Sequence, residues 1–91
     1  MAFEWDADKS ARNTAERGLP FDLAVLLFDS PTLEAADSRR DYGETRIRAI
    51  GQVGNVILAC VYTERGDARR IISLRYASRK ERHAYREAFP E

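Results

Sequence analysis

Arginine is the residue type in this chain with the most potential for chemistry. Thirteen of the 15 basic residues are arginine, and a guanidinium group binds phosphates and carboxylates through a rigid, two-pronged set of N–H donors. Residues 1–37 contain three basic and eight acidic residues, whereas residues 38–91 contain twelve basic and seven acidic ones. The net charge is zero, yet the second part of the chain has the composition of a surface that binds anions.

Two interpretations of these arginines remain open. They could form a solvated face with surface ion pairs, or they could bind phosphate groups. Two features favour phosphate binding. Arginine far outnumbers lysine, and tyrosines are interleaved with the arginines, as suits stacking on unpaired bases: Tyr62, Tyr76 and Tyr85.

The other reactive residue types are scarce. His83 is the single histidine and is expected to be exposed on a helix, while Cys60 is the single cysteine and is expected to be a buried, inert thiol. One histidine and one cysteine are too few for a structural zinc site. The sequence also lacks a phosphate-binding glycine loop and a serine hydrolase motif. We therefore predict a protein without a metal or another cofactor.

Compartment and domain count follow from simple features. The start of the chain, Met1 to Asp6, lacks the basic residues and apolar core of a signal peptide. The apolar runs Leu23 to Phe28 and Val56 to Tyr62 are far shorter than the ~20 residues that span a bilayer. We expect a cytoplasmic protein with no membrane role and one domain over residues 1–91.

Three helices are predicted from capping residues and apolar spacing. Asp6 is a suitable N-cap for a helix over Ala7 to Arg17, and Gly18 is a suitable C-cap. A short second helix follows Pro20, because apolar residues recur there at the i, i+3, i+4 and i+7 positions: Phe21, Ala24, Val25 and Phe28. The capping box from Ser78 to Glu81 begins a terminal helix.

The remaining segments predict strands. A short strand is expected around Phe3 to Trp5, and another at Thr32 to Ala36. Arg46 to Val53 and Val56 to Tyr62 flank Gly54-Asn55, a pair suited to a tight hairpin turn, and Arg69 to Tyr76 is the last strand. Ser38 to Gly43 is expected to be a polar loop. The predicted order is β-α-α-β-β-β-β-α, an α+β fold in which helices pack on one face of an antiparallel sheet.

Strand alternation predicts where the arginines point. Arg46, Arg48, Ile50 and Gln52 share one face, which is expected to be wet, and Arg69, Ile71, Ser73 and Arg75 share a face of the last strand. The middle strand is apolar on both faces. This pattern predicts helices on one face of the sheet and a partner or ligand on the other.

Motifs along nearly the whole chain resemble those of one known family. The N-terminal ones are Phe3-Glu4-Trp5-Asp6, Lys9, Asn13, Gly18, Phe21, Ala24 and Phe28-Asp29. Gly43-Glu44, Arg46, Ile50 and Gly51 follow. The densest are Val61-Tyr62-Thr63-Glu64-Arg65-Gly66 and Arg70-Ile71-Ile72-Ser73 with Arg75, Ala77, Glu81 and Tyr85. This set resembles the BrnT family, ribonuclease toxins of bacterial toxin-antitoxin pairs.

The resemblance implies a RelE-like fold and a metal-independent endoribonuclease that inhibits translation. It also implies neutralisation by a co-encoded antitoxin, BrnA. That partner carries a ribbon-helix-helix part, contacts DNA and represses the operon. The complex is thus expected to reach DNA only through the antitoxin.

Site hypotheses follow for RNA cleavage. Arg46 and Arg75 are predicted to clamp the phosphate, with Arg65 and Arg79 as helpers. Glu64 is the candidate base, and Tyr85 is a candidate acid or stacking platform. Predicted RNA contacts are Arg48, Arg70, Ser73 and Tyr62. The alternative is a noncatalytic interaction module that binds an acidic partner through its arginine face. A small-molecule enzyme ranks last, because a chain of this size has little room for a deep pocket.

Overall fold

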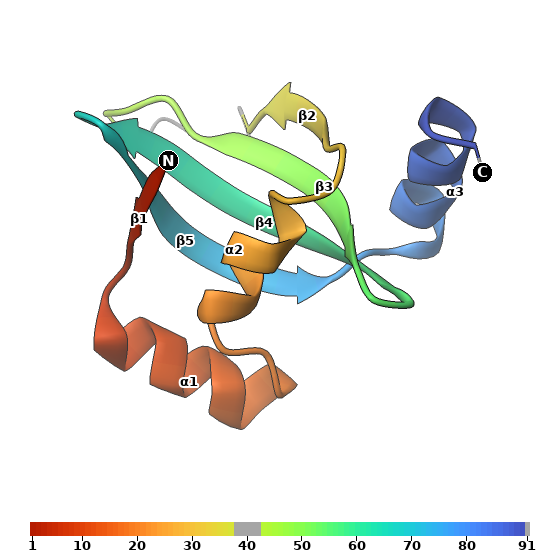
Figure 1. Cartoon of the computed structure of the whole chain (residues 1–91). Helices are drawn as coiled ribbons and strands as arrows, with labels where there is room; N and C mark the ends of the chain where they lie inside the picture. The colour runs from red at the N-terminus through yellow and green to blue at the C-terminus, as the bar shows by residue number, and fades with distance from the viewer. Residues whose placement is uncertain (38–42, 91) are drawn as a thin grey trace.

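The structure is a computed structural model that describes residues 1–37 and 43–90. Within these residues the elements, labelled in Figure 1, are in chain order β1 (Ala2–Glu4), α1 (Ala7–Arg17), α2 (Asp22–Leu27), β2 (Leu33–Ala36), β3 (Ile47–Val53), β4 (Val56–Arg65), β5 (Ala68–Tyr76) and α3 (Arg79–Ala88). The predicted α+β class is confirmed. The loop expected over 38–43 lies, except for Gly43, outside the described residues.

The five strands form one sheet in the order β1-β5-β4-β3-β2. Strands β2 to β5 are antiparallel to their neighbours, but β1 runs parallel to β5, with Ala2 opposite Ala68 and Glu4 opposite Arg70. The prediction of a purely antiparallel sheet was therefore wrong. A three-residue strand carries too little pattern to reveal its direction, which is set here by the path of the chain through α1 and α2.

Helices α1 and α2 cover one face of the sheet (Figure 1). Phe21 and Leu27 pack there against Ala49, Leu58 and Cys60, all of them buried. The packing of α2 on β3 is close: a Cβ atom built on Gly51 would lie 2.8 Å from Leu27 Cγ and 3.2 Å from the Leu27 carbonyl oxygen. Glycine is thus required at this position by the approach of α2.

Helix α3 packs against the opposite face. Its Tyr85 contacts a second buried cluster formed with Ile50, Ile57, Ala59 and Ala77. Ile50 and Ala59 alternate with the residues that face α1 and α2, so they point to the other side of the sheet. The prediction that the helices pack on one face was wrong, because β4 has an apolar side chain on both faces and the terminal helix buries the second set. The face that was expected to be exposed to solvent is accordingly buried at Ile50, which is 3% exposed.

A β-bulge in β5 changes which of its side chains share a face. Val61 lies opposite Ser73, but Tyr62 lies opposite Ile71, so Ile72 is an extra residue. Ile71 and Leu74 therefore both reach the core beneath α1 and α2. The prediction that Arg69, Ile71, Ser73 and Arg75 share one face was wrong, because the bulge shifts the alternation by one residue.

The predicted caps are confirmed. The Asp6 carboxylate accepts hydrogen bonds from the backbone N–H groups of Asp8 (2.8 Å) and Lys9 (3.2 Å), and Gly18 ends α1 with a φ of 73°. Both hydrogen bonds of the Ser78 capping box are present at the start of α3. These local signals fix where α1 begins and ends and where α3 begins.

Candidate nucleic-acid interface

Arginine side chains from β3, the residue before it and β5 lie on the face of the sheet that carries α3. Arg75 lies opposite Ala59, and Arg70 lies opposite Thr63. Because paired residues share a face, both belong to the face of the second cluster. Arg48 is opposite Val61 on the same face. Together with the preceding Arg46 these residues form what we call the arginine surface: Arg46, Arg48, Arg70 and Arg75.

Glu81 of α3 is the anionic centre of this surface. Arg75 donates two hydrogen bonds to its carboxylate, from Nη1 to Oε1 at 2.7 Å and from Nη2 to Oε2 at 2.9 Å. The Arg48 Nε atom lies 3.7 Å from Glu81 Oε2. Such a two-point arginine–carboxylate pair is strong and holds the guanidinium plane in one orientation. Glu81 therefore aims Arg75 and draws Arg48 toward it.

The same carboxylate also begins the helix. Glu81 Oε1 accepts a hydrogen bond from the backbone N–H of Ser78 at 2.8 Å, and the Glu81 side chain is only 13% exposed. The hydrogen bonds from Arg75 lower the pKa of Glu81 to about 2, although burial acts in the opposite direction. Glu81 is thus ionised at neutral pH and ties the start of α3 to the arginine surface.

The other arginines of the surface have different surroundings. Arg70 donates a 2.9 Å hydrogen bond to Glu4 of β1, and Arg46 Nη2 lies 3.7 Å from Glu44. The Arg48 Nε–H group is buried and has no hydrogen-bond acceptor within the part of the chain that the structure describes. A buried donor without a partner costs free energy, so Arg48 is suited to gain an acceptor from a ligand or from a small shift of Glu81.

The structure brings together six of the predicted site residues. Ser73 is half-buried on the same face, in the cross-strand row that runs from Arg48 through Val61. Arg79, the first residue of α3, is exposed directly after the N-cap residue Ser78. The six are Arg46, Arg48, Arg70, Ser73, Arg75 and Arg79. Arg65 is exposed at the far end of β4, beside the turn to β5.

Tyr62 and Glu64 lie on the opposite face from the arginine surface. Tyr62 is 2% exposed, and its hydroxyl donates a 2.6 Å hydrogen bond to Glu34. Burial, followed by this hydrogen bond, raises the pKa of Tyr62. Glu64 lies 3.5 Å from Arg69, whose guanidinium group stacks over the Tyr62 ring at 4.7 Å and over Phe28 at 4.8 Å. Neither Tyr62 nor Glu64 can therefore meet a phosphate held by Arg75.

Tyr85 is a core residue of the α3 face. It is 4% exposed, its hydroxyl donates a 2.8 Å hydrogen bond to the Pro31 carbonyl oxygen, and its ring packs against Phe89. The hydroxyl already has an acceptor, and the residue is almost fully buried. Tyr85 accordingly supports the position of α3.

Sequence reasoning missed the position of Glu81. Glu81 occupies the third position of a capping box, which accounts for a glutamate there by itself. The capping pattern does not predict the contact of Glu81 with Arg75. The sequence does contain a signal for this contact, because Glu81 stands six residues after Arg75. When a helix begins directly after a strand, its first turn can lie beside the last arginine of that strand.

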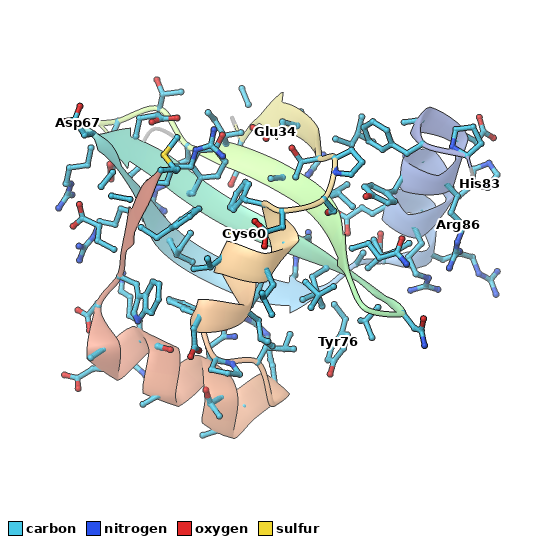
Figure 2. The ribbon with its side chains drawn as sticks, in the orientation of Figure 1. Glu34, Cys60, Asp67, Tyr76, His83 and Arg86 are labelled. Atoms are coloured by element: carbon cyan, nitrogen blue, oxygen red, sulfur yellow. The ribbon has the colours of Figure 1, made fainter. Side chains whose placement is uncertain are left out.

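The scarce reactive residues lie where they were expected. Figure 2 shows His83 and Arg86 on the outer side of α3 and Cys60 beneath α2. The His83 side chain is 74% exposed and meets Glu87 at 2.6 Å. Burial raises the pKa of Cys60 to about 12, so its thiol stays protonated and inert.

Over 1–37 and 43–90, no group of three or more histidine, cysteine, aspartate or glutamate side chains could hold a metal ion. No helix in these two ranges is long and apolar enough to cross a membrane.

The fold and the site define a class: a small α+β protein that presents arginines on a half-covered sheet face, which is suited to an anionic ligand. A family model described as the ribonuclease toxin, BrnT, of type II toxin-antitoxin systems matches residues 5–81. The chain therefore belongs to the BrnT family of ribonuclease toxins. No curated protein matches the chain. The resemblance noted from its motifs is confirmed.

Proposed function

We propose that this protein is an endoribonuclease toxin that binds RNA phosphates on the arginine surface and inhibits translation by cleaving RNA. The observation that supports this most is the orientation of Arg75 by the two hydrogen bonds that it donates to Glu81, beside an Arg48 Nε–H that lacks an acceptor among the described residues. Guanidinium groups fixed in this way stabilise charge that develops on a phosphate in the transition state.

The proposed reaction is a transesterification within the RNA. The 2′-oxygen forms a bond to phosphorus while the bond from phosphorus to the 5′-oxygen breaks. The 2′-hydroxyl proton passes to water, and the leaving 5′-oxygen takes a proton from water. Arg75, Arg46 and Arg48 stabilise the extra negative charge on the phosphorane-like transition state, and no step uses a metal ion. We assign no proton transfer to Glu64 or Tyr85, because neither lies on this surface.

We also propose that a BrnA-like antitoxin neutralises the protein in the cytoplasm by covering the arginine surface. Acidic side chains of such a partner would meet the same guanidinium groups that hold RNA, so the two ligands would exclude each other. Contact with operon DNA would then come from the ribbon-helix-helix part of the antitoxin.

The test is incubation of the purified protein with end-labelled RNA, with and without EDTA, and in a translating cell extract. The wild type should cleave RNA equally well in EDTA. The double variant Arg46→Ala, Arg75→Ala should leave the RNA intact. Arg12→Ala, Arg86→Ala removes the same charge from exposed positions of α1 and α3, so it should cleave like the wild type.

All three proteins are first compared by circular dichroism, so that loss of fold is not mistaken for loss of activity. Intact RNA in every wild-type tube, including the translating extract, would refute the enzyme. Tight binding of an acidic partner by a wild type that cleaves nothing would establish the noncatalytic interaction module instead.

A further inference from the structure

A groove of about 500 Å³ opens beside the arginine surface, between the edge strand β2, its neighbour β3 and the first half of α3. Its apolar lining comes from Leu33 and Ala35 of β2, Ile50 of β3 and Ala84 of α3. Its cations are Arg48 and Lys80. An apolar lining with a few charged groups at its rim is the composition of a site for a flat organic ligand that carries phosphate.

The acidic residues that line the groove are already occupied. Glu81 holds Arg75, as described above. Glu34 accepts a 2.6 Å hydrogen bond at Oε1 from the Tyr62 hydroxyl and another 2.6 Å bond at Oε2 from the Thr32 hydroxyl. The positive charges therefore dominate what an incoming ligand meets. The Arg48 side chain is 40% exposed, and Lys80 is exposed in the first turn of α3.

The groove is continuous with the arginine surface, because Arg48 and Glu81 belong to both. A strand of RNA whose phosphate lies at Arg75 must place an adjoining nucleotide either over open sheet or in this groove. Unpaired bases bind on apolar surfaces and on arginine planes, and the groove offers both within reach of a lysine for the next phosphate.

We propose that this groove is a nucleotide subsite that holds the base next to the phosphate bound at Arg75. The base packs on Ile50 and Ala84 against the plane of Arg48, and Lys80 pairs with the following phosphate. The inference rests on the proposed function, and it adds to it a place where the length and sequence of the RNA are read.

The test uses fluorescent 2′-O-methyl RNA, in which the attacking hydroxyl is blocked, so binding is measured without cleavage. The double variant Ala35→Leu, Ala84→Leu fills the groove without adding charge or an aromatic ring. Its matched control is Ala36→Leu, Ala88→Leu, which changes exposed alanines of the same two elements that do not line the groove. Both variants are checked by thermal unfolding.

The groove-filling variant should bind single-stranded oligonucleotides about fivefold to a hundredfold more weakly than the control, as expected for loss of one base contact. The wild type should gain by a similar factor when a dinucleotide is extended by one nucleotide on the groove side, and the variant should gain nothing. In a second measurement, Lys80→Gln should lower the slope of log Kd against log salt by about 1, as expected for the loss of one phosphate contact. Lys9→Gln, which changes the chain's other lysine, should leave that slope unchanged.

Equal RNA binding by the groove-filling variant and its control would overturn the subsite while leaving RNA cleavage at the arginine surface intact. A variant that binds RNA normally but no longer binds its antitoxin would also overturn the subsite, since the groove would then dock a protein. If the wild type binds no oligonucleotide and cleaves no RNA, the subsite and the proposed function fail together.

Discussion

The two faces of the sheet use arginine in opposite ways. On the face covered by α1 and α2, Arg69 lies over both the Phe28 and the Tyr62 ring and meets Glu64. On the face that α3 covers only in part, Arg75 is held at its edge by Glu81 and stands beside Arg48. Arg69 and Arg75 stand six residues apart in the same strand. Arg69 is nevertheless packed against aromatic rings, whereas Arg75 belongs to the arginine surface.

This difference shows that the surroundings of an arginine decide its role. The Arg69 guanidinium plane stacks on two aromatic rings and meets Glu64, although its buried Nε–H, like that of Arg48, has no hydrogen-bond acceptor among the described residues. On the arginine surface, Arg48 and Arg75 both approach the Glu81 carboxylate, so two guanidinium groups share that negative charge. We expect a phosphate to bind at the arginine surface and not at Arg69, whose guanidinium plane is covered by the two rings.

The strongest contrast is expected between alanine variants of these two arginines. Arg75→Ala should lower RNA cleavage by about 10²-fold, because an oriented donor to the transition state is removed. Arg69→Ala should cleave like the wild type and lose about 1 kcal/mol of stability with its cation–π contacts. Gel assays of labelled RNA and urea unfolding measure the two effects. Equal losses of cleavage in both variants would abolish the distinction between the faces.

The packed face should be intolerant of added volume at Gly51. Gly51→Val should destabilise the protein by about 1–3 kcal/mol, because its side chain would overlap Leu27 and press on the backbone of α2. Gly51→Ala should fall between this variant and the wild type. The measurement is chemical denaturation followed by circular dichroism. Full stability of Gly51→Val would mean that α2 moves freely away from β3.

The open face should depend on acid through Glu81. Its pKa is lowered to about 2 from the ordinary value of 4.5 for a glutamate, so its ion pair stabilises the fold above pH 4.5 and is lost as the pH falls through about 2. Glu81→Gln should therefore be about 1.5 kcal/mol less stable than the wild type at neutral pH, and the difference should vanish near pH 2.

Unfolding of both proteins across this pH range gives the comparison. Glu87→Gln, at an exposed position of the same helix, serves as the control and should differ little from the wild type. A Glu81→Gln deficit that stayed constant down to pH 2 would show that the ionised carboxylate is not its cause.

The smallest effect is expected at Tyr62. Tyr62→Phe removes the hydroxyl bond to Glu34 from the packed face and should cost about 1 kcal/mol of stability. RNA cleavage should not change, because the ring lies on the side of the sheet away from Arg75. Parallel cleavage and denaturation assays decide this. A folded Tyr62→Phe protein with impaired cleavage would return Tyr62 to the RNA contacts.

The sequence predicted the features that depend on neighbouring residues. The Asp6 cap, the Gly18 terminus and the Ser78 capping box are local hydrogen-bonding patterns, and the structure confirms each one. Strand alternation likewise placed Arg46 and Arg48 together, since β3 has no irregularity.

The features that the sequence could not reveal depend on distant pairing. The bulge at Ile72 is visible only in the register between β4 and β5, and it separates Arg69 from Arg75. Helix α3 packs on the face where Tyr85 contacts apolar residues that α1 and α2 leave uncovered, among them Ile50 and Ile57. For this reason Tyr62, Glu64 and Tyr85 were assigned to a site that their backbone positions do not reach.

The parallel pairing of β1 with β5 has a consequence for protein synthesis. Glu4 is synthesised well before its partner Arg70, which stands 66 positions later in the chain, and Glu81 follows later still. A growing chain therefore lacks the pairing of β1 with β5, and the carboxylate that orients Arg75, until residues 68–81 have been added. We expect products truncated before residue 68 to lack both features.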